Sequence, residues 1–103
     1  MEYNIILSDS ANHDLNSIFD YISNKIHDDA AAGCYADHME KVFKTLANQH
    51  KIYPLSENLT LRKREYRPCI IDDFSMLYRV DDLRQEIFIS RFFFGRYDYS
   101  KYL

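Results

Sequence analysis

The stretch that decides the fold is residues 74–94, FSMLYRVDDLRQEIFISRFFF. Its first part alternates Phe74, Met76, Tyr78 and Val80 with Ser75, Leu77 and Arg79, which is the pattern of a half-buried β-strand. The polar run 81–85 is typical of a hairpin loop, and 86–94 is again rich in β-branched and aromatic residues. We therefore expect two antiparallel strands, 74–80 and 86–94, joined by a short loop.

The second of these strands carries large apolar groups on both sides. Strict alternation divides its side chains between two faces, Ile87, Ile89, Arg91 and Phe93 on one and Phe88, Ser90, Phe92 and Phe94 on the other. A strand that is apolar on both sides needs cover on both sides, and a partner protein is one source of that cover.

The N-terminal half predicts a strand followed by two helices. The segment 2–7, EYNIIL, is short and rich in β-branched residues, and the serines that follow it suit a helix N-cap. Apolar residues then recur at helical spacing over 11–26 and over 32–46, and polar residues of the first helix, Asp14 among them, are expected to face solvent. The short connection predicts an antiparallel helical hairpin, and Gly33 indicates a close crossing of its helices.

The segment 59–67 is predicted to be extended and charged, and because Pro68 lacks a backbone donor, this segment either borders the sheet or is interrupted there. The order along the chain is thus one strand, two helices and three strands. We expect an α+β fold in which an N-terminal strand and an antiparallel helical hairpin pack on one face of a small antiparallel β-sheet. The length suits a single domain, residues 1–103.

Composition and charge argue against membrane-spanning, secreted and strongly basic nucleic-acid-binding proteins. No run approaches the ~20 apolar residues of a membrane span, and the N-terminus does not have the pattern of a secretory signal, so we expect a cytoplasmic protein. The net charge of −3 argues against a generally basic nucleic-acid binder. The charge is uneven, because residues 1–50 hold three Lys or Arg against eight Asp or Glu, whereas residues 51–103 hold ten against eight.

The motifs of the common enzyme classes are absent. The four histidines have no metal-ligand spacing, and there is no phosphate-binding loop, dinucleotide fingerprint or nucleophile elbow, so we expect neither a metal nor a cofactor. The acidic pairs fall at expected turns and caps. What remains is a set of arginines, lysines and tyrosines in the C-terminal half. Such a set can hold RNA and stabilise a phosphorane-like transition state, or it can simply keep an exposed sheet soluble, and the residues alone leave both readings open.

The element order and the C-terminal segment resemble the RelE/ParE superfamily of toxins from type II toxin–antitoxin modules. The resemblance rests on Tyr78-Arg79-Val80-Asp81 at the end of one strand, on Gly95-Arg96-Tyr97-Asp98-Tyr99 after the last strand, and on the final Leu103. It implies a growth-inhibiting toxin that a cognate antitoxin neutralises in a hetero-oligomer. It also implies one of two targets, DNA gyrase, which is poisoned without enzymatic chemistry, or mRNA, which is cleaved on the ribosome.

The resemblance assigns candidate roles to three groups of residues. Catalysis, in a nuclease, would fall to Arg96, Tyr99 and Tyr102. Target or RNA binding would fall to Arg62, Lys63, Arg64, Arg67, Arg79, Arg91 and Lys101. Antitoxin binding would fall to Phe92, Phe93 and Phe94.

Two departures from the RNA-cleaving branch favour gyrase. Ser75 stands where that branch is expected to carry a strand arginine, and the tail holds no histidine. The acidic balance points the same way, because association with ribosomal RNA gains from positive charge. We therefore expect a ParE-like gyrase poison, with a RelE-like endoribonuclease and a non-toxic binding module as the alternatives.

Overall fold

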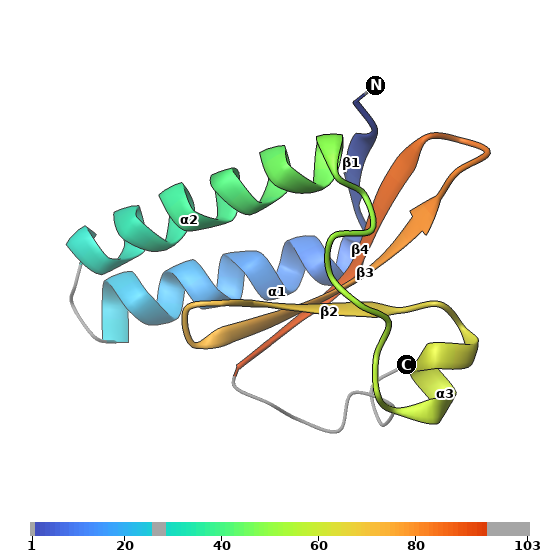
Figure 1. Cartoon of the computed structure of the whole chain (residues 1–103). Helices are drawn as coiled ribbons and strands as arrows, with labels where there is room; N and C mark the ends of the chain where they lie inside the picture. The colour runs from blue at the N-terminus through green and yellow to red at the C-terminus, as the bar shows by residue number, and fades with distance from the viewer. Residues whose placement is uncertain (1, 26–28, 95–103) are drawn as a thin grey trace.

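The computed structural model describes residues 2–25 and 29–94, and four strands and their helices account for most of them (Figure 1). In chain order the elements are β1 (Asn4–Leu7), α1 (Asp9–Asp20), the π-helical turn η1 (Tyr21–Lys25), α2 (Asp29–Asn48), α3 (Leu59–Lys63), β2 (Arg67–Ile71), β3 (Phe74–Asp81) and β4 (Glu86–Phe94). The strands form one sheet in the order β1-β4-β3-β2. The expected α+β fold and the expected hairpin of β3 and β4 are confirmed.

The sheet is mixed rather than antiparallel. β1 runs parallel to β4, with Asn4 beside Glu86 and Leu7 beside Ile89, whereas β2, β3 and β4 are mutually antiparallel. The expectation of an antiparallel sheet is therefore wrong at this edge. The partner of β1 lies about 80 residues away in the chain, so no local turn sets the direction in which the two strands pair.

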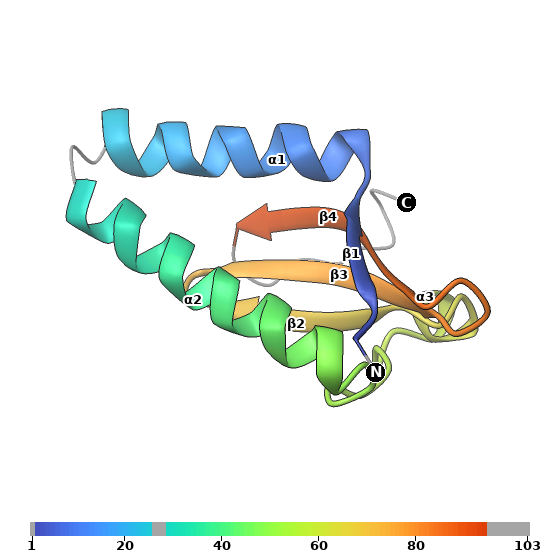
Figure 2. The same cartoon turned by 90° about the horizontal axis from the view of Figure 1, so that it is seen from above.

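The helices α1 and α2 both pack on the same face of the sheet, as expected (Figures 1 and 2). The main core lies between them and that face, and Leu46, Met76, Tyr78 and Ile89 are fully buried there. Among the described residues, no helix combines the length and the apolar character that crossing a lipid bilayer requires.

The start of α1 is as expected, whereas Gly33 within α2 differs from the expectation. Ser8 caps α1 by accepting a hydrogen bond from the Ala11 backbone N–H at 3.0 Å. In α2, a Cβ added at Gly33 would meet no atom within 4 Å, so the predicted close crossing at this glycine is wrong.

The segment 59–67 is not an extended strand. Residues 59–63 form α3, because the Asn58 side chain caps the backbone N–H groups of Thr60 and Leu61 at 3.0 and 3.2 Å. The helix ends in a Schellman motif, in which Glu65 adopts a φ of 62° and the Tyr66 N–H donates to the Leu61 carbonyl. The strand β2 starts only at Arg67 and includes Pro68, which an edge strand tolerates.

A β-bulge in β4 overturns the strict alternation expected for that strand. The pairing with β3 shifts from Tyr78–Ile89 to Leu77–Arg91, which leaves Ser90 as an extra residue. Beyond the bulge, Phe92 therefore joins Ile89 on the face that the helices cover, while Phe93 lies on the opposite face.

Candidate functional site

The face of the sheet that α1 and α2 leave uncovered is called the open face here. The small helix α3 covers part of it, where Leu61, Leu77 and Phe93 form a second buried cluster with Tyr66 packed against them. Near α3, both faces of the sheet are thus covered by the chain, one by α1 and α2 and the other by α3. The rest of the open face, toward the β3–β4 hairpin, is exposed.

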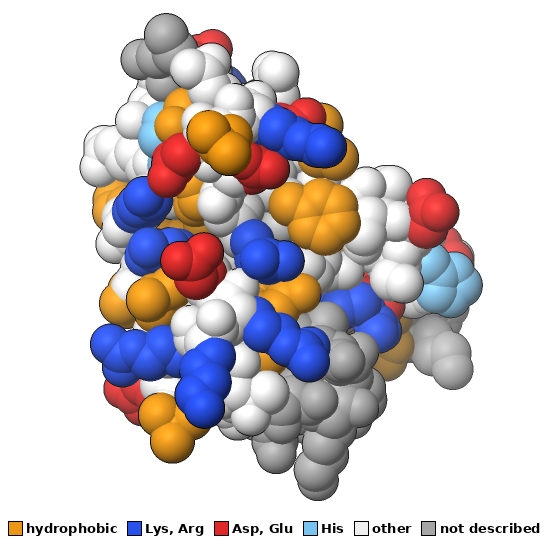
Figure 3. All heavy atoms as spheres, turned by 90° about the vertical axis from the view of Figure 1, so that its right-hand side faces the viewer, with side chains coloured by type: hydrophobic (Ala, Val, Ile, Leu, Met, Phe, Trp, Pro, Cys, Tyr) orange, Lys and Arg blue, Asp and Glu red, His pale blue; other side chains and the backbone are white. Residues whose placement is uncertain are grey.

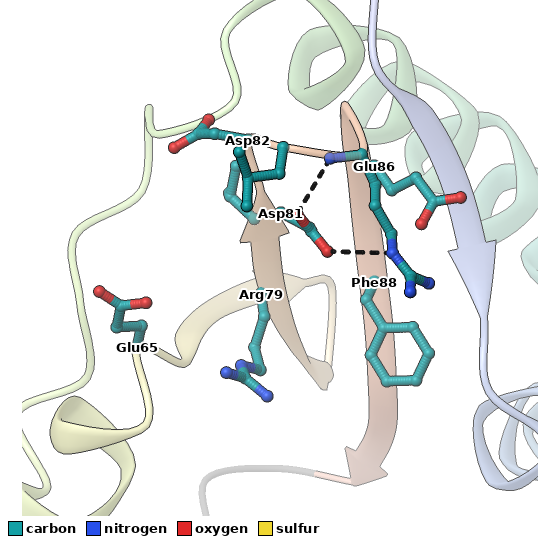
Figure 4. Close-up of a pocket in the computed structure, with 9 residues that line it drawn as sticks. Glu65, Arg79, Asp81, Asp82, Glu86 and Phe88 are labelled. Carbon is teal, nitrogen blue, oxygen red and sulfur yellow. Dashed lines mark hydrogen bonds and ion pairs between the residues drawn. The ribbon is translucent and has the colours of Figure 1, made fainter.

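A cavity of about 460 Å³ opens at the hairpin end of the open face (Figure 4). Arg79 of β3 and Phe88 of β4 line this region from neighbouring strands, and Glu65 lines it from the turn after α3, with its carboxylate directed away from both of them. The lining holds four carboxylates against two guanidinium groups, and it consists of Glu65, Arg79, Val80, Asp81, Asp82, Leu83, Arg84, Glu86 and Phe88. The cavity therefore carries a net negative charge.

Two of the four carboxylates are held within the chain. Asp81 accepts a hydrogen bond from the Arg84 backbone N–H at 3.1 Å. Asp82 accepts hydrogen bonds from Lys51 Nζ at 2.9 Å and from the Tyr3 hydroxyl at 3.0 Å, and these partners lower the pKa of Asp82 below its ordinary value.

The other two carboxylates have no such partner. Within the described part of the chain, neither Glu65 nor Glu86 has an ion pair or a side-chain hydrogen bond. The Arg79 guanidinium lies 5.3 Å from the centre of the Tyr66 ring, so its nearest partner is an aromatic face.

The cations predicted to bind a target divide into two groups. Arg62, Lys63 and Arg64 are exposed at the end of α3, and Figure 3 shows Lys and Arg side chains gathered on this side of the molecule. Arg67, in contrast, is only partly exposed and donates from Nη1 to the Tyr53 carbonyl at 2.6 Å. Arg67 therefore stabilises the fold through a hydrogen bond within the chain.

Arg91 also has a structural partner, one that the sequence pattern did not reveal. Its Nε and Nη2 donate to the two oxygens of Asp14 at 2.6 and 3.1 Å, and the Phe92 backbone N–H donates to the same carboxylate at 3.1 Å. Because β1 pairs with β4 only as far as Ile89, α1 lies beside the rest of that edge and Asp14 supplies the acceptor that a strand would have supplied. The expectation that Asp14 faces solvent is wrong.

The three phenylalanines are placed differently from one another. Phe92 is 3% exposed in the main core and Phe93 is 7% exposed beneath α3, so each is covered by the chain itself. Of Phe94, only the backbone pairing with Phe74 is described. Antitoxin binding by these residues stays a prediction, and Arg96, Tyr99, Lys101 and Tyr102 lie outside the described residues.

In the part of the chain that the structure describes, no three His, Cys, Asp or Glu side chains lie close enough together to hold a metal ion. The open face instead combines exposed cations, unpaired carboxylates and apolar side chains. Exposed apolar side chains that polar residues surround mark surfaces that contact another macromolecule.

Comparison with known proteins assigns the chain to a family. Residues 5–99 match the model of a family described as the ParE toxin of type II toxin–antitoxin system, parDE. A solved structure described as the chromosomal ParDE TA system from P. aeruginosa is similar, with a TM-score of 0.68 and 20% identity over 92% of this chain and 98% of that chain. The toxin–antitoxin complex RelBE2 from Mycobacterium tuberculosis has a TM-score of 0.59 and 16% identity, over 91% of this chain and 99% of that one.

No curated protein matches the sequence significantly. At 20% identity or below, the likeness to the two solved structures shows the fold, and the family follows from the match that spans nearly the whole chain. The resemblance found in the sequence is thereby confirmed: this chain belongs to the ParE toxin family of type II toxin–antitoxin systems.

Proposed function

We propose that this chain inhibits growth by poisoning DNA gyrase and that a cognate antitoxin holds it inactive. The family match is to ParE toxins. The sequence favours the same branch, because Ser75 stands where the RNA-cleaving toxins are expected to carry an arginine. The observation that carries the choice of target is the charge of the cavity on the open face, where four carboxylates outnumber two guanidinium groups.

Cleavage of mRNA would make opposite demands on this surface. A ribonuclease without a metal must bind phosphates and stabilise the charge that develops on the phosphorus, which takes several free cations close together. Here Arg91 is bound to Asp14 and Arg67 to the Tyr53 carbonyl, and Arg79 lines a cavity that four carboxylates also line. A protein surface tolerates such a mixture of charges better than an RNA backbone does.

The antitoxin is inferred from the relatives. Both similar structures are described as toxin–antitoxin systems or complexes, and we extend that assembly to this chain as a hetero-oligomer of toxin and antitoxin. A binding partner that folds over the toxin would cover exposed apolar side chains such as Ile52 and Ile70, which are 48% and 49% exposed.

The test is a gyrase assay on the purified chain, freed of antitoxin. We expect loss of supercoiling of relaxed plasmid and accumulation of cleaved DNA, and both effects should disappear when the antitoxin is added in equimolar amount. Supercoiling that continues at large excess of the chain would refute the proposal.

One observation keeps the endoribonuclease as a second candidate, namely the exposed run Arg62-Lys63-Arg64 on α3. After induced expression, primer extension on mRNA would then reveal breaks within codons, and replacing all three residues by Gln would abolish them. Growth arrest with intact mRNA and damaged DNA excludes this candidate, and induction without growth arrest would favour a non-toxic binding module.

A further inference from the structure

The tip of the β3–β4 hairpin carries an unusually exposed leucine. Leu83 is 99% exposed in the loop 82–85, and the hairpin projects beyond the body of the sheet (Figure 1). A single exposed leucine is common on protein surfaces and by itself indicates nothing. What distinguishes Leu83 is the loop that presents it and the side chains that lie behind it.

The loop is braced from several directions. The Asp81 carboxylate accepts from the Arg84 backbone N–H within the loop, while Asp82 is bound by Lys51 after α2 and by Tyr3 before β1. These contacts hold the hairpin against two other parts of the molecule. A side chain on a braced loop loses little conformational freedom on binding, so more of its burial energy becomes affinity.

Two further exposed apolar residues continue the surface from the loop onto the sheet. Phe88 lines the same cavity as Leu83, and Ile6 lies beside Phe88 in the register of β1 and β4. Phe88 and Ile6 are each 39% exposed, whereas Ile87 and Ile89 of the same strand as Phe88 are fully buried. Together Ile6, Leu83 and Phe88 form what we call the hairpin patch.

Charge decides what kind of segment this patch suits. The adjoining cavity holds Glu65 and Glu86, which have no ion pair within the described residues, and its lining is net negative. An acidic segment or a phosphate would meet like charge there, whereas a lysine or arginine would find a carboxylate without a partner. The apolar residues beside the cavity suit aliphatic or aromatic neighbours of that cation.

We propose that the hairpin patch docks a protein segment that presents apolar side chains together with one lysine or arginine, which pairs with one of the two glutamates, Glu65 or Glu86, that line opposite sides of the cavity. The segment belongs to gyrase, an assignment that rests on the proposed function. Leu83 is the apolar anchor of this contact, and the two glutamates select for the basic side chain.

The experiment compares Leu83→Ser with Leu59→Ser in the gyrase supercoiling assay. Leu59 is the matched control, because it is also a strongly exposed leucine, at 74%, but lies at the start of α3, away from the hairpin. We expect Leu83→Ser to raise the concentration for half-inhibition by about tenfold or more, and Leu59→Ser to leave it within about twofold. Circular dichroism and thermal unfolding check that both variants keep the wild-type fold.

The charge part of the proposal has its own variant. Glu65→Lys combined with Glu86→Lys should weaken inhibition by a similar factor, while Glu57→Lys, at an exposed position before α3, should not. Inhibition that improves in the double variant would overturn the choice of a basic partner and point to an acidic segment or to DNA.

The remaining outcomes separate this inference from the proposed function. Wild-type inhibition that Leu83→Ser retains in full overturns the hairpin patch and leaves the gyrase proposal standing. Loss of antitoxin binding in Leu83→Ser with gyrase inhibition unchanged overturns the patch as a gyrase contact and assigns it to the antitoxin. A wild-type chain without effect on gyrase overturns the proposed function and this contact together.

Discussion

Replacing Asp14 by Ala should destabilise the protein more than any other change to a single polar side chain of α1. The Asp14 carboxylate binds the Arg91 guanidinium through two hydrogen bonds and also accepts from the Phe92 backbone N–H. The side chains of Arg91 and Asp14 are only 28% and 14% exposed, so water replaces these bonds poorly. The substitution therefore leaves a partly buried cation and an unpaired N–H at the edge of β4.

The magnitude follows from these two losses. Breaking a fully buried ion pair by removing one partner costs about 3–5 kcal/mol, and the partial exposure of Arg91 reduces that figure to about 1–3 kcal/mol. The orphaned Phe92 N–H adds about 1 kcal/mol. We expect the free energy of unfolding to fall by about 2–4 kcal/mol in Asp14→Ala, as measured by urea denaturation.

A double-mutant cycle with Arg91→Ala isolates the pair itself. The coupling energy between Asp14 and Arg91 should be about 1–2 kcal/mol, whereas the exposed pair of Glu40 and Lys44 on α2 should give less than about 0.5 kcal/mol. Asp14→Asn, which keeps an acceptor for the Phe92 N–H, should lose less stability than Asp14→Ala. A loss below about 1 kcal/mol in Asp14→Ala, with coupling no larger than in the control pair, would refute the structural role assigned to Asp14.

Three further predictions concern stability. Gly33→Ala should raise the free energy of unfolding by about 0.5–1 kcal/mol, because the added methyl group meets open space in α2, and a decrease in urea denaturation would contradict this. Burial, and to a lesser extent the negative charge of Asp72, raises the pKa of Tyr35, so this residue stabilises the fold below its ordinary pKa of about 10 and stops doing so as the pH rises further. Tyr35→Phe should therefore flatten the alkaline limb of a plot of stability against pH, and an unchanged limb would show that Tyr35 does not cause it. Lys51 and Tyr3 lower the pKa of Asp82, so its contribution is present above its ordinary pKa of about 4 and is lost as the pH falls through the lowered value. Asp82→Asn should destabilise at pH 7 and have little effect at pH 3 in thermal unfolding, whereas an equal effect at both would argue against ionic bracing of the hairpin.

The elements that sequence reasoning placed correctly are those whose pattern is long and local. The alternation over 74–80 and the helical spacing over 11–26 and 32–46 each repeat several times, and the structure contains the corresponding strand and helices. The helix α3 was missed because five residues are too few to show helical spacing, although Asn58 is a strong N-cap residue and was the available signal.

The candidate site was harder to predict than the fold. The sequence pointed to the basic residues as a group, but it did not distinguish the exposed Arg62 from Arg67 and Arg91, which the chain uses internally. It also gave no indication that Arg79 shares a cavity with four carboxylates, because Glu65 and Glu86 reach the cavity from segments about 20 residues apart. Residue types thus suggested a surface for binding, and only their arrangement showed its charge.

By itself, the sequence determined the α+β class and the β3–β4 hairpin, because these follow from local patterns. It also determined membership of the toxin superfamily, through the order of the elements and short motifs near the C-terminus. The tertiary structure alone decided the parallel pairing of β1, the bulge at Ser90 and the role of Asp14. The physical reason is common to all three. Beyond the end of β1, the neighbour of β4 on that side is the helix α1. The backbone groups of β4 there must find hydrogen-bond partners that only the packed molecule brings close.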